Sequence, residues 1–385
     1  MQKKKVLPII VLSQFFCTSL WFAGNGVLDE LISDYNLKIQ ALGHLVSAVQ
    51  FGFILGTLLF ATLTIADRYS PSKVFFTSAV IAAIFNLGML WEGNTLLTLV
   101  GSRFLTGFFL AGIYPVGMKI AADYFKEGLG RSLSFLVGAL VLGTALPHLL
   151  ADSSLFTQWK WVIISTSFLS FAGGVLVVLN LSDGPYRKSA QQLKLQAAFT
   201  IFKNQELKKA ALGYFGHMWE LYAFWAFVPL IFKTYQELHQ VVLPISLWSF
   251  IIIAIGSVGC VIGGICSEYF GLKKVASWSL FISCLCCLLS PLFFYQPYTS
   301  VFLVFLLIWG MTVIADSPLF STLVANHADG PLKGSALTLV NCIGFAITIL
   351  SIQLLNSFQG SYPLTSIYMM LGIGPMVGLW ALNKK

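Results

Sequence analysis

The chain has 385 residues, of which 57% are hydrophobic and 10% are charged, and its mean hydropathy is +0.83. Soluble domains carry about 25% charged residues, so this composition excludes an ordinary water-soluble fold and predicts an all-α membrane protein. The net charge of +8 follows from basic residues near the ends of predicted membrane spans, so no nucleic-acid partner is expected.

Apolar runs near the bilayer-spanning length of about 20 residues follow one another along the whole chain. Short clusters of Lys, Asp, Pro and Gly separate them. The twelve predicted spans are 6–27, 40–65, 74–92, 96–119, 132–150, 161–181, 209–232, 243–266, 275–294, 300–322, 334–356 and 363–382.

The basic residues are distributed unequally across these spans. With both termini in the cytoplasm, 19 of the 23 Lys and Arg residues lie inside, Lys38, Lys160 and Lys233 lie outside, and Arg103 lies within a span. Because positive loops stay cytoplasmic, we expect a multi-pass protein of the inner (plasma) membrane in this orientation. The basic and apolar start of the chain is interpreted as a retained first span, since its apolar run is too long for a signal peptide.

All seven cysteines lie within predicted spans. Disulfide frameworks and zinc sites are not expected there, and the cluster Cys284–Cys287 is interpreted as helix packing. No metal and no other cofactor is predicted. The expected partners are the lipid bilayer and a small-molecule substrate, and the expected state is a monomer.

One long hydrophilic segment, residues 182–208, separates an N-terminal six-helix bundle (1–181) from a C-terminal one (209–385). Part of this cytoplasmic linker has apolar residues at helical spacing, which predicts an amphipathic helix on the membrane surface. These residues are Leu193, Leu195, Ala198, Ile201 and Phe202.

The two halves carry similar turns. Asp67 after span two and Glu268 after span eight each precede basic residues, and the two acids are 201 positions apart. This spacing indicates a duplicated six-helix unit. Small residues at helix-packing spacing support close helix contacts in both halves: Gly52 and Gly56 in span two, and Gly256, Gly259 and Gly263 in span eight.

These turns resemble the loop motif of the major facilitator superfamily, Gly-x-x-x-Asp-Arg-x-Gly-x-Arg/Lys-Arg/Lys. The second copy matches at Gly264, Glu268, Gly271, Lys273 and Lys274. The first keeps Asp67, Arg68 and Lys73 but has Leu63 and Ser70 in place of the glycines. The stretch from Arg103 to Pro115 resembles the fourth-helix motif of the family, whereas the Gly-Pro signature of drug/proton antiporters is absent from span five.

The resemblance implies two pseudosymmetric six-helix bundles around a central cavity, with the loop-motif residues acting in gating. Transport would proceed by alternating access, with substrate held at mid-depth. The twelve spans and the central linker fit this fold independently of the motif.

Arg103 lies too deep in span four to reach the membrane surface easily. Tyr114 returns to the same helix face, so this face is predicted to line a cavity, and both residues are candidate substrate contacts. The alternative for Arg103 is a structural brace that donates hydrogen bonds to neighbouring helices. Lys119 is assigned to the positive cytoplasmic side.

The sequence GHMWELYAFW places His217 and Glu220 on one face of span seven. An ionisable group in the hydrocarbon is costly and is by default functional, so we predict that Glu220, with His217, exchanges protons. The alternative is a neutral Glu220 hydrogen-bonded to His217 or to backbone. Asp316 in span ten is a second candidate for proton coupling, and the following Ser317 and Pro318 suggest equally that it caps a restarted helix.

Further polar and aromatic residues could hold a polar substrate, although each is also explained by contacts between helices. They are Gln14, Trp21, Asn25, Gln50, Trp219 and Trp309, with Trp225 and Thr18 as neighbours.

The sequence therefore predicts a secondary active transporter that moves a small polar or anionic metabolite, or a siderophore-like chelate, with protons or sodium as the coupling ion. No ATP-binding Gly-x-x-x-x-Gly-Lys-Ser/Thr loop is present. Efflux of amphipathic drugs by proton antiport is the alternative within transport. A transporter-like sensor and an intramembrane enzyme are the alternatives outside it, although no nucleophile and base stand at enzyme-like spacing, so the protein is not expected to be an enzyme.

Overall fold

The computed structural model describes residues 3–125, 129–152, 158–187, 199–329, 332–359 and 362–384. In these ranges the secondary structure consists of helices without strands, which confirms the all-α prediction. The chain divides into two compact units, Met1–Leu193 (unit 1) and Lys194–Lys385 (unit 2). Most of the predicted amphipathic helix of the linker lies outside the described residues.

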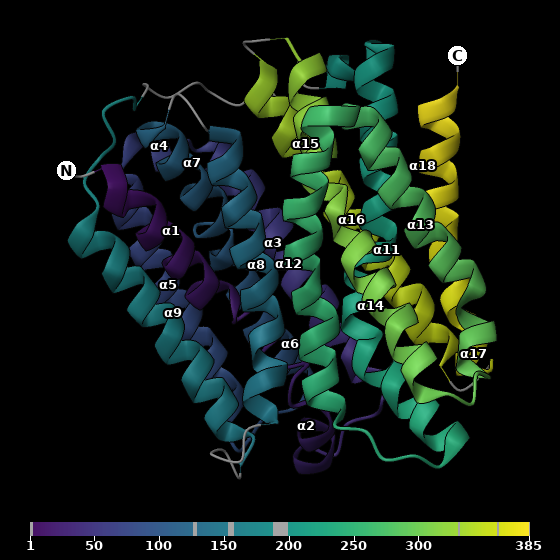
Figure 1. Cartoon of the computed structure of the whole chain (residues 1–385). Coiled ribbons are helices and arrows are strands. Elements are labelled where there is room, and N and C mark those ends of the chain that lie inside the picture. Colours follow the sequence, from purple (N-terminus) through teal and green to yellow (C-terminus); the bar gives the residue numbers. More distant parts are fainter. Residues whose placement is uncertain are drawn as a thin grey trace. The chain divides into compact units, whose positions relative to one another are not determined.

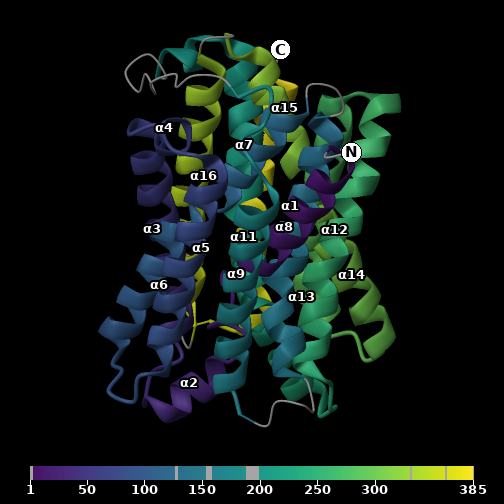
Figure 2. The same ribbon diagram turned by 90° about the vertical axis from the view of Figure 1, so that its left-hand side faces the viewer.

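In unit 1, α4 and α7 lie at one end and α2 lies at the other (Figures 1 and 2). Helix α3 packs along α6, and α5 packs along α9. The elements of this unit are α1 (Lys3–Thr18), α2 (Leu28–Asp34), α3 (Ala41–Thr62), α4 (Ile65–Arg68), α5 (Pro71–Leu87), η1 (Gly88–Leu90), α6 (Leu96–Leu110), α7 (Tyr114–Tyr124), α8 (Leu129–Ala151) and α9 (Lys160–Asn180).

In unit 2, α15 and α17 lie at opposite ends (Figure 1). Helix α11 is the longest and packs against α16 and α18, while α12 packs along α14. The elements are η2 (Phe199–Lys203), α11 (Gln205–His239), α12 (Ile245–Phe270), α13 (Leu272–Phe294), α14 (Thr299–Ala315), α15 (Ser317–His327), α16 (Lys333–Phe358), α17 (Leu364–Ile367), η4 (Tyr368–Gly372) and α18 (Ile373–Asn383).

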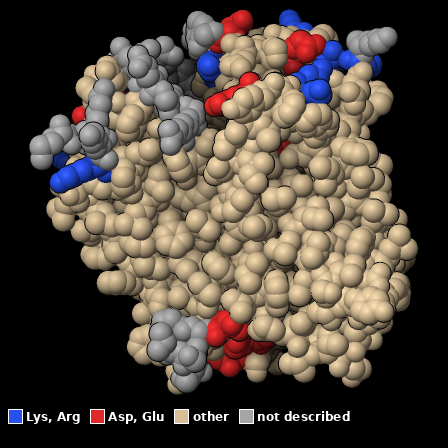
Figure 3. Space-filling view, in the orientation of Figure 1, with Lys and Arg blue, Asp and Glu red and all other residues tan. Residues whose placement is uncertain are grey.

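Ten helical segments within the described residues are long and apolar enough to cross a membrane. They correspond to ten of the twelve predicted spans, and α1 and α11 lie at the remaining two, the first and the seventh. Figure 3 shows mainly neutral side chains over the middle of this face, with charged side chains toward its upper and lower edges. The chain is therefore a multi-pass membrane protein.

The first predicted span, 6–27, is helical only as far as Thr18 and continues as turns. Two hydroxyl side chains explain this end. Thr18 Oγ1 donates to the carbonyl of Gln14 at 2.8 Å, and Ser19 Oγ donates to that of Phe16 at 2.6 Å. Such local bonds compete with the helical ladder, and Gly24 and Gly26 follow directly.

Two other predicted spans, 96–119 and 300–322, are each interrupted. The first is divided between α6 and α7, and the second between α14 and α15. Both α7 and α15 have 11 residues and a proline in the first turn, Pro115 and Pro318 respectively. Proline fits the first turn because its missing N–H would have no helical partner there.

The interrupted helices show that the two units repeat each other at a spacing of 203 residues. Helix α7 begins at Tyr114 and α15 at Ser317, which are 203 positions apart. A Cβ on Gly107 would lie 2.1 Å from the carbonyl oxygen of Val49, and one on Gly310 would lie 2.2 Å from that of Ile252. Gly310 lies 203 positions after Gly107, and Ile252 lies 203 positions after Val49, so the close helix crossing itself is duplicated.

Candidate functional site

Glu220 on α11 is buried, and three side chains of unit 2 donate hydrogen bonds to it. Trp309 Nε1 lies 2.6 Å from Oε1, Cys287 Sγ lies 3.2 Å from the same oxygen, and Ser283 Oγ lies 2.9 Å from Oε2. Ser283 and Cys287 are on α13 and Trp309 is on α14. Among the described residues no cation forms an ion pair with this carboxyl group. Because an unpaired buried carboxylate is costly, this environment suits a group that binds a proton.

His217, one turn before Glu220 on α11, faces a different partner. Its Nδ1 lies 2.8 Å from Asp316 Oδ1, and both side chains are 1% exposed. The two atoms are at ion-pair distance, although the angles are not those of a directional hydrogen bond. The pair connects α11 to the junction between α14 and α15. No hydrogen bond joins His217 to Glu220, so His217 is not the partner that the structural alternative for Glu220 would need.

Asp316 does not cap α15. It occupies the position before Ser317, but its side chain makes no hydrogen bond to the backbone N–H groups of the first turn, and its backbone is in the right-handed helical region. The carboxyl group instead points to His217. The junction places this side chain toward α11, where it pairs with His217.

Arg103 on α6 is 1% exposed and is held by residues of unit 1. Its Nη1 donates to Asn86 Oδ1 at 3.0 Å, and its Nη2 donates to the carbonyl of Trp21. Asn86 in turn donates to Ser167 Oγ at 2.9 Å, to Thr166 Oγ1 at 3.2 Å and to a carbonyl of α9. The guanidinium thus connects four segments of the bundle, which favours the brace over direct substrate contact.

The polar residues predicted to hold substrate in unit 1 include two unusual glutamines. Gln14 on α1 and Gln50 on α3 are 0% exposed, and neither amide has a hydrogen-bond partner among the described residues. Asn25 is buried, and its Nδ2 also has no such partner. Trp21 packs against Phe53 with ring centroids 4.9 Å apart. An unpaired buried amide costs about 1–3 kcal/mol, so a ligand or water that satisfied these groups would be strongly favoured.

The aromatic candidates of unit 2 form internal contacts. Trp219 Nε1 donates to the carbonyl of Met370 at 3.0 Å. Trp309 is 0% exposed and stacks on Phe224 at 4.4 Å, besides its bond to Glu220. Tyr114, the candidate from unit 1, is the first residue of α7 and is partly exposed. Trp309 is therefore better described as a partner of the buried acid than as a cavity wall.

The first loop motif is a paired charge cluster. Asp67 Oδ1 lies 2.9 Å from Lys119 Nζ on α7, and the same lysine lies 3.4 Å from Asp123 Oδ1. Arg68 Nε donates to Thr64 Oγ1 at 3.1 Å, whereas Lys73 is exposed. Lys119, assigned from sequence to topology alone, is thus the centre of a contact between α4 and α7.

The segment after α9 closes this cluster. Arg187 Nη2 donates to the carbonyls of Asp67 and Tyr69 at 2.7 and 2.8 Å, and the guanidinium pairs with Asp183. Ser70 Oγ donates to Asp183 Oδ1 at 2.7 Å. The serine that departs from the family pattern is therefore used in a hydrogen bond.

The second loop motif, although the better sequence match, has no such cluster. Glu268 and Lys273 are exposed and form no ion pair among the described residues. Lys274 lies over the Trp278 ring at 5.0 Å. Gly271 adopts a φ of +89° between α12 and α13, which a residue with a Cβ would adopt only with strain, and Gly264 has open space around it.

Sequence reasoning missed several residues that complete these sites. Ser283 and Cys287 lie in apolar runs where hydroxyl and thiol groups are common, so only their contact with Glu220 distinguishes them. Asp183 and Arg187 were included in the linker. A polar residue within an apolar span was a usable signal for Asn86, which lies inside predicted span 74–92.

The match to a protein-family model shows which family the chain belongs to. The model of the Major Facilitator Superfamily matches residues 10–352. The chain belongs to the Major Facilitator Superfamily. As a member of this superfamily it is a membrane transporter, and its spans, loop motifs and duplicated units follow that plan.

Relatives and solved structures agree with this assignment. AraJ of Escherichia coli (strain K12) is 23% identical over 346 residues, which cover 86% of this chain and 83% of AraJ. YyaJ of Bacillus subtilis (strain 168) is 22% identical over 344 residues, which cover 77% of this chain and 74% of YyaJ.

Two solved transporters have the same fold. The structure of a mutant of the nucleoside transporter NupG has a TM-score of 0.74 and 14% identity, and the match covers 98% of both chains. The proton:xylose symporter XylE has the same TM-score and identity, over 98% of this superfamily member and 94% of that chain. At this identity the likeness concerns the fold.

Proposed function

We propose that this protein is a proton-coupled transporter of a small polar or anionic metabolite in the inner membrane, working by alternating access with both termini cytoplasmic. The observation that carries the proposal is the pair of adjacent titratable sites on one face of α11. His217 pairs with Asp316, and Glu220 stands one turn away without a cation.

Position gives these groups a mechanical role. The carboxyl of Asp316 precedes the first residue of α15, so its pairing with His217 ties α11 to the joint between α14 and α15. Protonation of Asp316 removes the charge that attracts an imidazolium, which weakens this tie. Binding and release of a proton would thereby change how α15 is held, and a transporter needs such a coupling between charge and conformation.

Two features support a polar substrate. The unpaired amides of Gln14 and Gln50 offer both donors and acceptors in an otherwise apolar unit. Arg103 uses Nη1 and Nη2 for protein partners, no carboxylate pairs with it among the described residues, and its positive charge favours an anionic group nearby.

The test is a screen of candidate metabolites in proteoliposomes with an imposed pH gradient. We expect one compound to accumulate with wild type, and accumulation to fall to background with Glu220→Gln and with Asp316→Asn, while exchange without a gradient persists. Glu92→Gln is the matched control, since Glu92 is exposed in the turn before α6.

Accumulation that is unchanged in both variants would refute the proton role of the two acids. Accumulation that depends on a sodium gradient instead would show that sodium, and not the proton, is the coupling ion. If nothing accumulates with wild type under either gradient, import is wrong and efflux becomes the direction to test.

A further inference from the structure

The two oxygens of Glu220 have chemically different neighbours. Oε1 accepts hydrogen bonds from Trp309 and Cys287, whereas among the described residues Oε2 accepts one from the hydroxyl of Ser283. We propose that Glu220 carries its proton on Oε2, and that Ser283 is the positioning residue that accepts this proton's hydrogen bond. The inference deepens the proposed function, on which it rests for its significance, but it concerns a structural property that is measurable without transport.

Donor chemistry favours Oε2 over Oε1 as the protonated oxygen. The indole N–H of Trp309 can only donate, and its 2.6 Å contact requires an acceptor at Oε1. Cys287 adds a weak S–H donor to the same oxygen at 3.2 Å. A carbonyl oxygen serves two donors well, whereas the hydroxyl oxygen of a carboxylic acid is a poorer acceptor. Trp309 is also held by its stack on Phe224, so it is not free to turn away.

Ser283 has a second acceptor for its hydroxyl hydrogen, which it needs if it is to accept a hydrogen bond from protonated Glu220. Its Oγ lies 2.9 Å from Glu220 Oε2 and 3.2 Å from the carbonyl oxygen of Leu280 on its own helix. When Glu220 is charged, the hydroxyl donates to Oε2. When a proton from water binds Oε2, the new O–H donates to Ser283 Oγ, and the serine hydroxyl rotates to donate to Leu280. One covalent O–H bond forms at Glu220, and the covalent O–H bond of Ser283 stays intact while its hydrogen bond changes acceptor.

Among the titratable groups that surround it, Glu220 is the one expected to gain or lose the proton. The titratable neighbours are His217 on the same helix, Asp316 just before α15, and the thiols of α13, which are Cys284, Cys286 and Cys287. His217 and Asp316 are paired with each other at 2.8 Å. Cys284 donates to the carbonyl of Gly372, so it does not compete for Oε2.

Infrared difference spectroscopy of the full chain in lipid tests the proposal. The carboxylic C=O band that appears on acidification and is missing in Glu220→Gln belongs to Glu220. We expect Trp309→Phe to raise the frequency of this band most, because the carbonyl oxygen loses its shortest donor, and Cys287→Ala to raise it less. Ser283→Ala should change it less than Trp309→Phe, and Ser283→Thr should restore the wild-type band.

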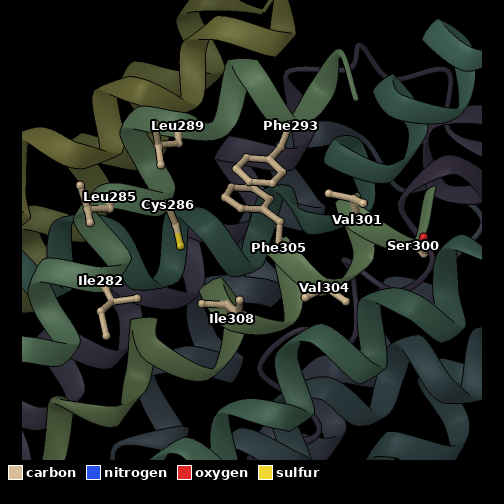
Figure 4. A pocket seen from close by; sticks show the side chains of 10 residues that line it. All are labelled: Ile282, Leu285, Cys286, Leu289, Phe293, Ser300, Val301, Val304, Phe305 and Ile308. Atoms are coloured by element: carbon tan, nitrogen blue, oxygen red, sulfur yellow. The ribbon is translucent and has the colours of Figure 1, made fainter. Parts of the chain in front are cut away.

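Two matched controls come from α13. Ser290→Ala removes a buried hydroxyl that donates only to the carbonyl of Cys287, at 2.8 Å. Cys286→Ala removes the neighbouring thiol, which lines an apolar groove of about 480 Å³ together with Leu285, Phe305 and Ile308 (Figure 4). Neither variant should move the band.

The reverse order, in which Ser283→Ala raises the frequency and Trp309→Phe does not, would place the proton on Oε1 and overturn the proposal. So would the absence of any band that Glu220→Gln removes, since the carboxyl would then stay charged. If the band shifts are as expected but uptake does not depend on the pH gradient, the proposed function is wrong while the position of the proton on Oε2 is confirmed.

Discussion

At the residue scale, three buried titratable residues of unit 2, His217, Glu220 and Asp316, have no counterpart of the same kind in unit 1. His217 and Gln14 are equivalent by the spacing of 203 residues, as are Glu220 and Cys17, and Asp316 corresponds to Ile113. Unit 1 therefore has Gln14, Cys17 and Ile113 at the positions equivalent to these three buried residues of unit 2. The amide of Gln14 cannot exchange a proton near neutral pH, so the proposed proton exchange has no equivalent at this position of unit 1.

Arg103 provides a residue-scale prediction. Arg103→Lys keeps the positive charge but loses the planar fork that reaches Asn86 and the Trp21 carbonyl together. We expect thermal unfolding in detergent to show a loss of about 1–3 kcal/mol, since hydrogen bonds to a charged group are lost in a buried site. Arg68→Lys, at an exposed site, is the control. Unchanged stability with abolished substrate binding would make Arg103 a substrate contact instead.

At the element scale, the helix crossings of α3 with α6 and of α12 with α14 depend on glycines that admit a backbone carbonyl. Gly107 faces Val49 and Gly310 faces Ile252, each at a distance that no Cβ would tolerate. The adjoining interruptions before α7 and α15 are also equivalent. In unit 2 the interruption directs the carboxyl group of Asp316 toward α11. In unit 1 the equivalent residue is the apolar Ile113, so the equivalent interruption has no carboxyl group.

Gly107→Ala tests the crossing. The methyl group would collide with the carbonyl of Val49, so we expect a loss of about 1–3 kcal/mol from overpacking, seen as a lower midpoint of thermal unfolding. Gly101→Ala on the same helix has open space around it and should be neutral or slightly stabilising. Equal effects of the two substitutions would show that helix propensity, rather than the crossing, limits stability.

At the scale of the whole molecule, one loop cluster distinguishes the two units. The cluster of Asp67, Lys119 and Arg187 ties three segments of unit 1. The matching turn of unit 2 is unpaired, because α12 continues unbroken to Phe270 while α3 ends at Thr62 and a separate short helix carries Asp67. Two turns with similar sequences thus have different contacts.

Reporter fusions test the orientation. A green fluorescent protein fused after Lys203 should fluoresce and alkaline phosphatase at the same point should be inactive, because the basic residues hold this segment in the cytoplasm. Fusions in the turn between α11 and α12, residues 241–244, should give the opposite result. A reversed pattern at both points would contradict the predicted topology.

The sequence by itself determined the membrane class, the approximate positions of the spans, the repeat and the presence of buried ionisable groups. These follow from local constraints, since every backbone group in hydrocarbon must be satisfied within a helix and every charge there is costly. Only the tertiary structure decided which side chains meet. Glu220 has hydrogen-bond partners 63, 67 and 89 positions away, and Asp316 pairs with His217, 99 positions away. Such contacts depend on how helix faces pack, and packing is set by residues distant in the chain rather than by the periodicity of any one span.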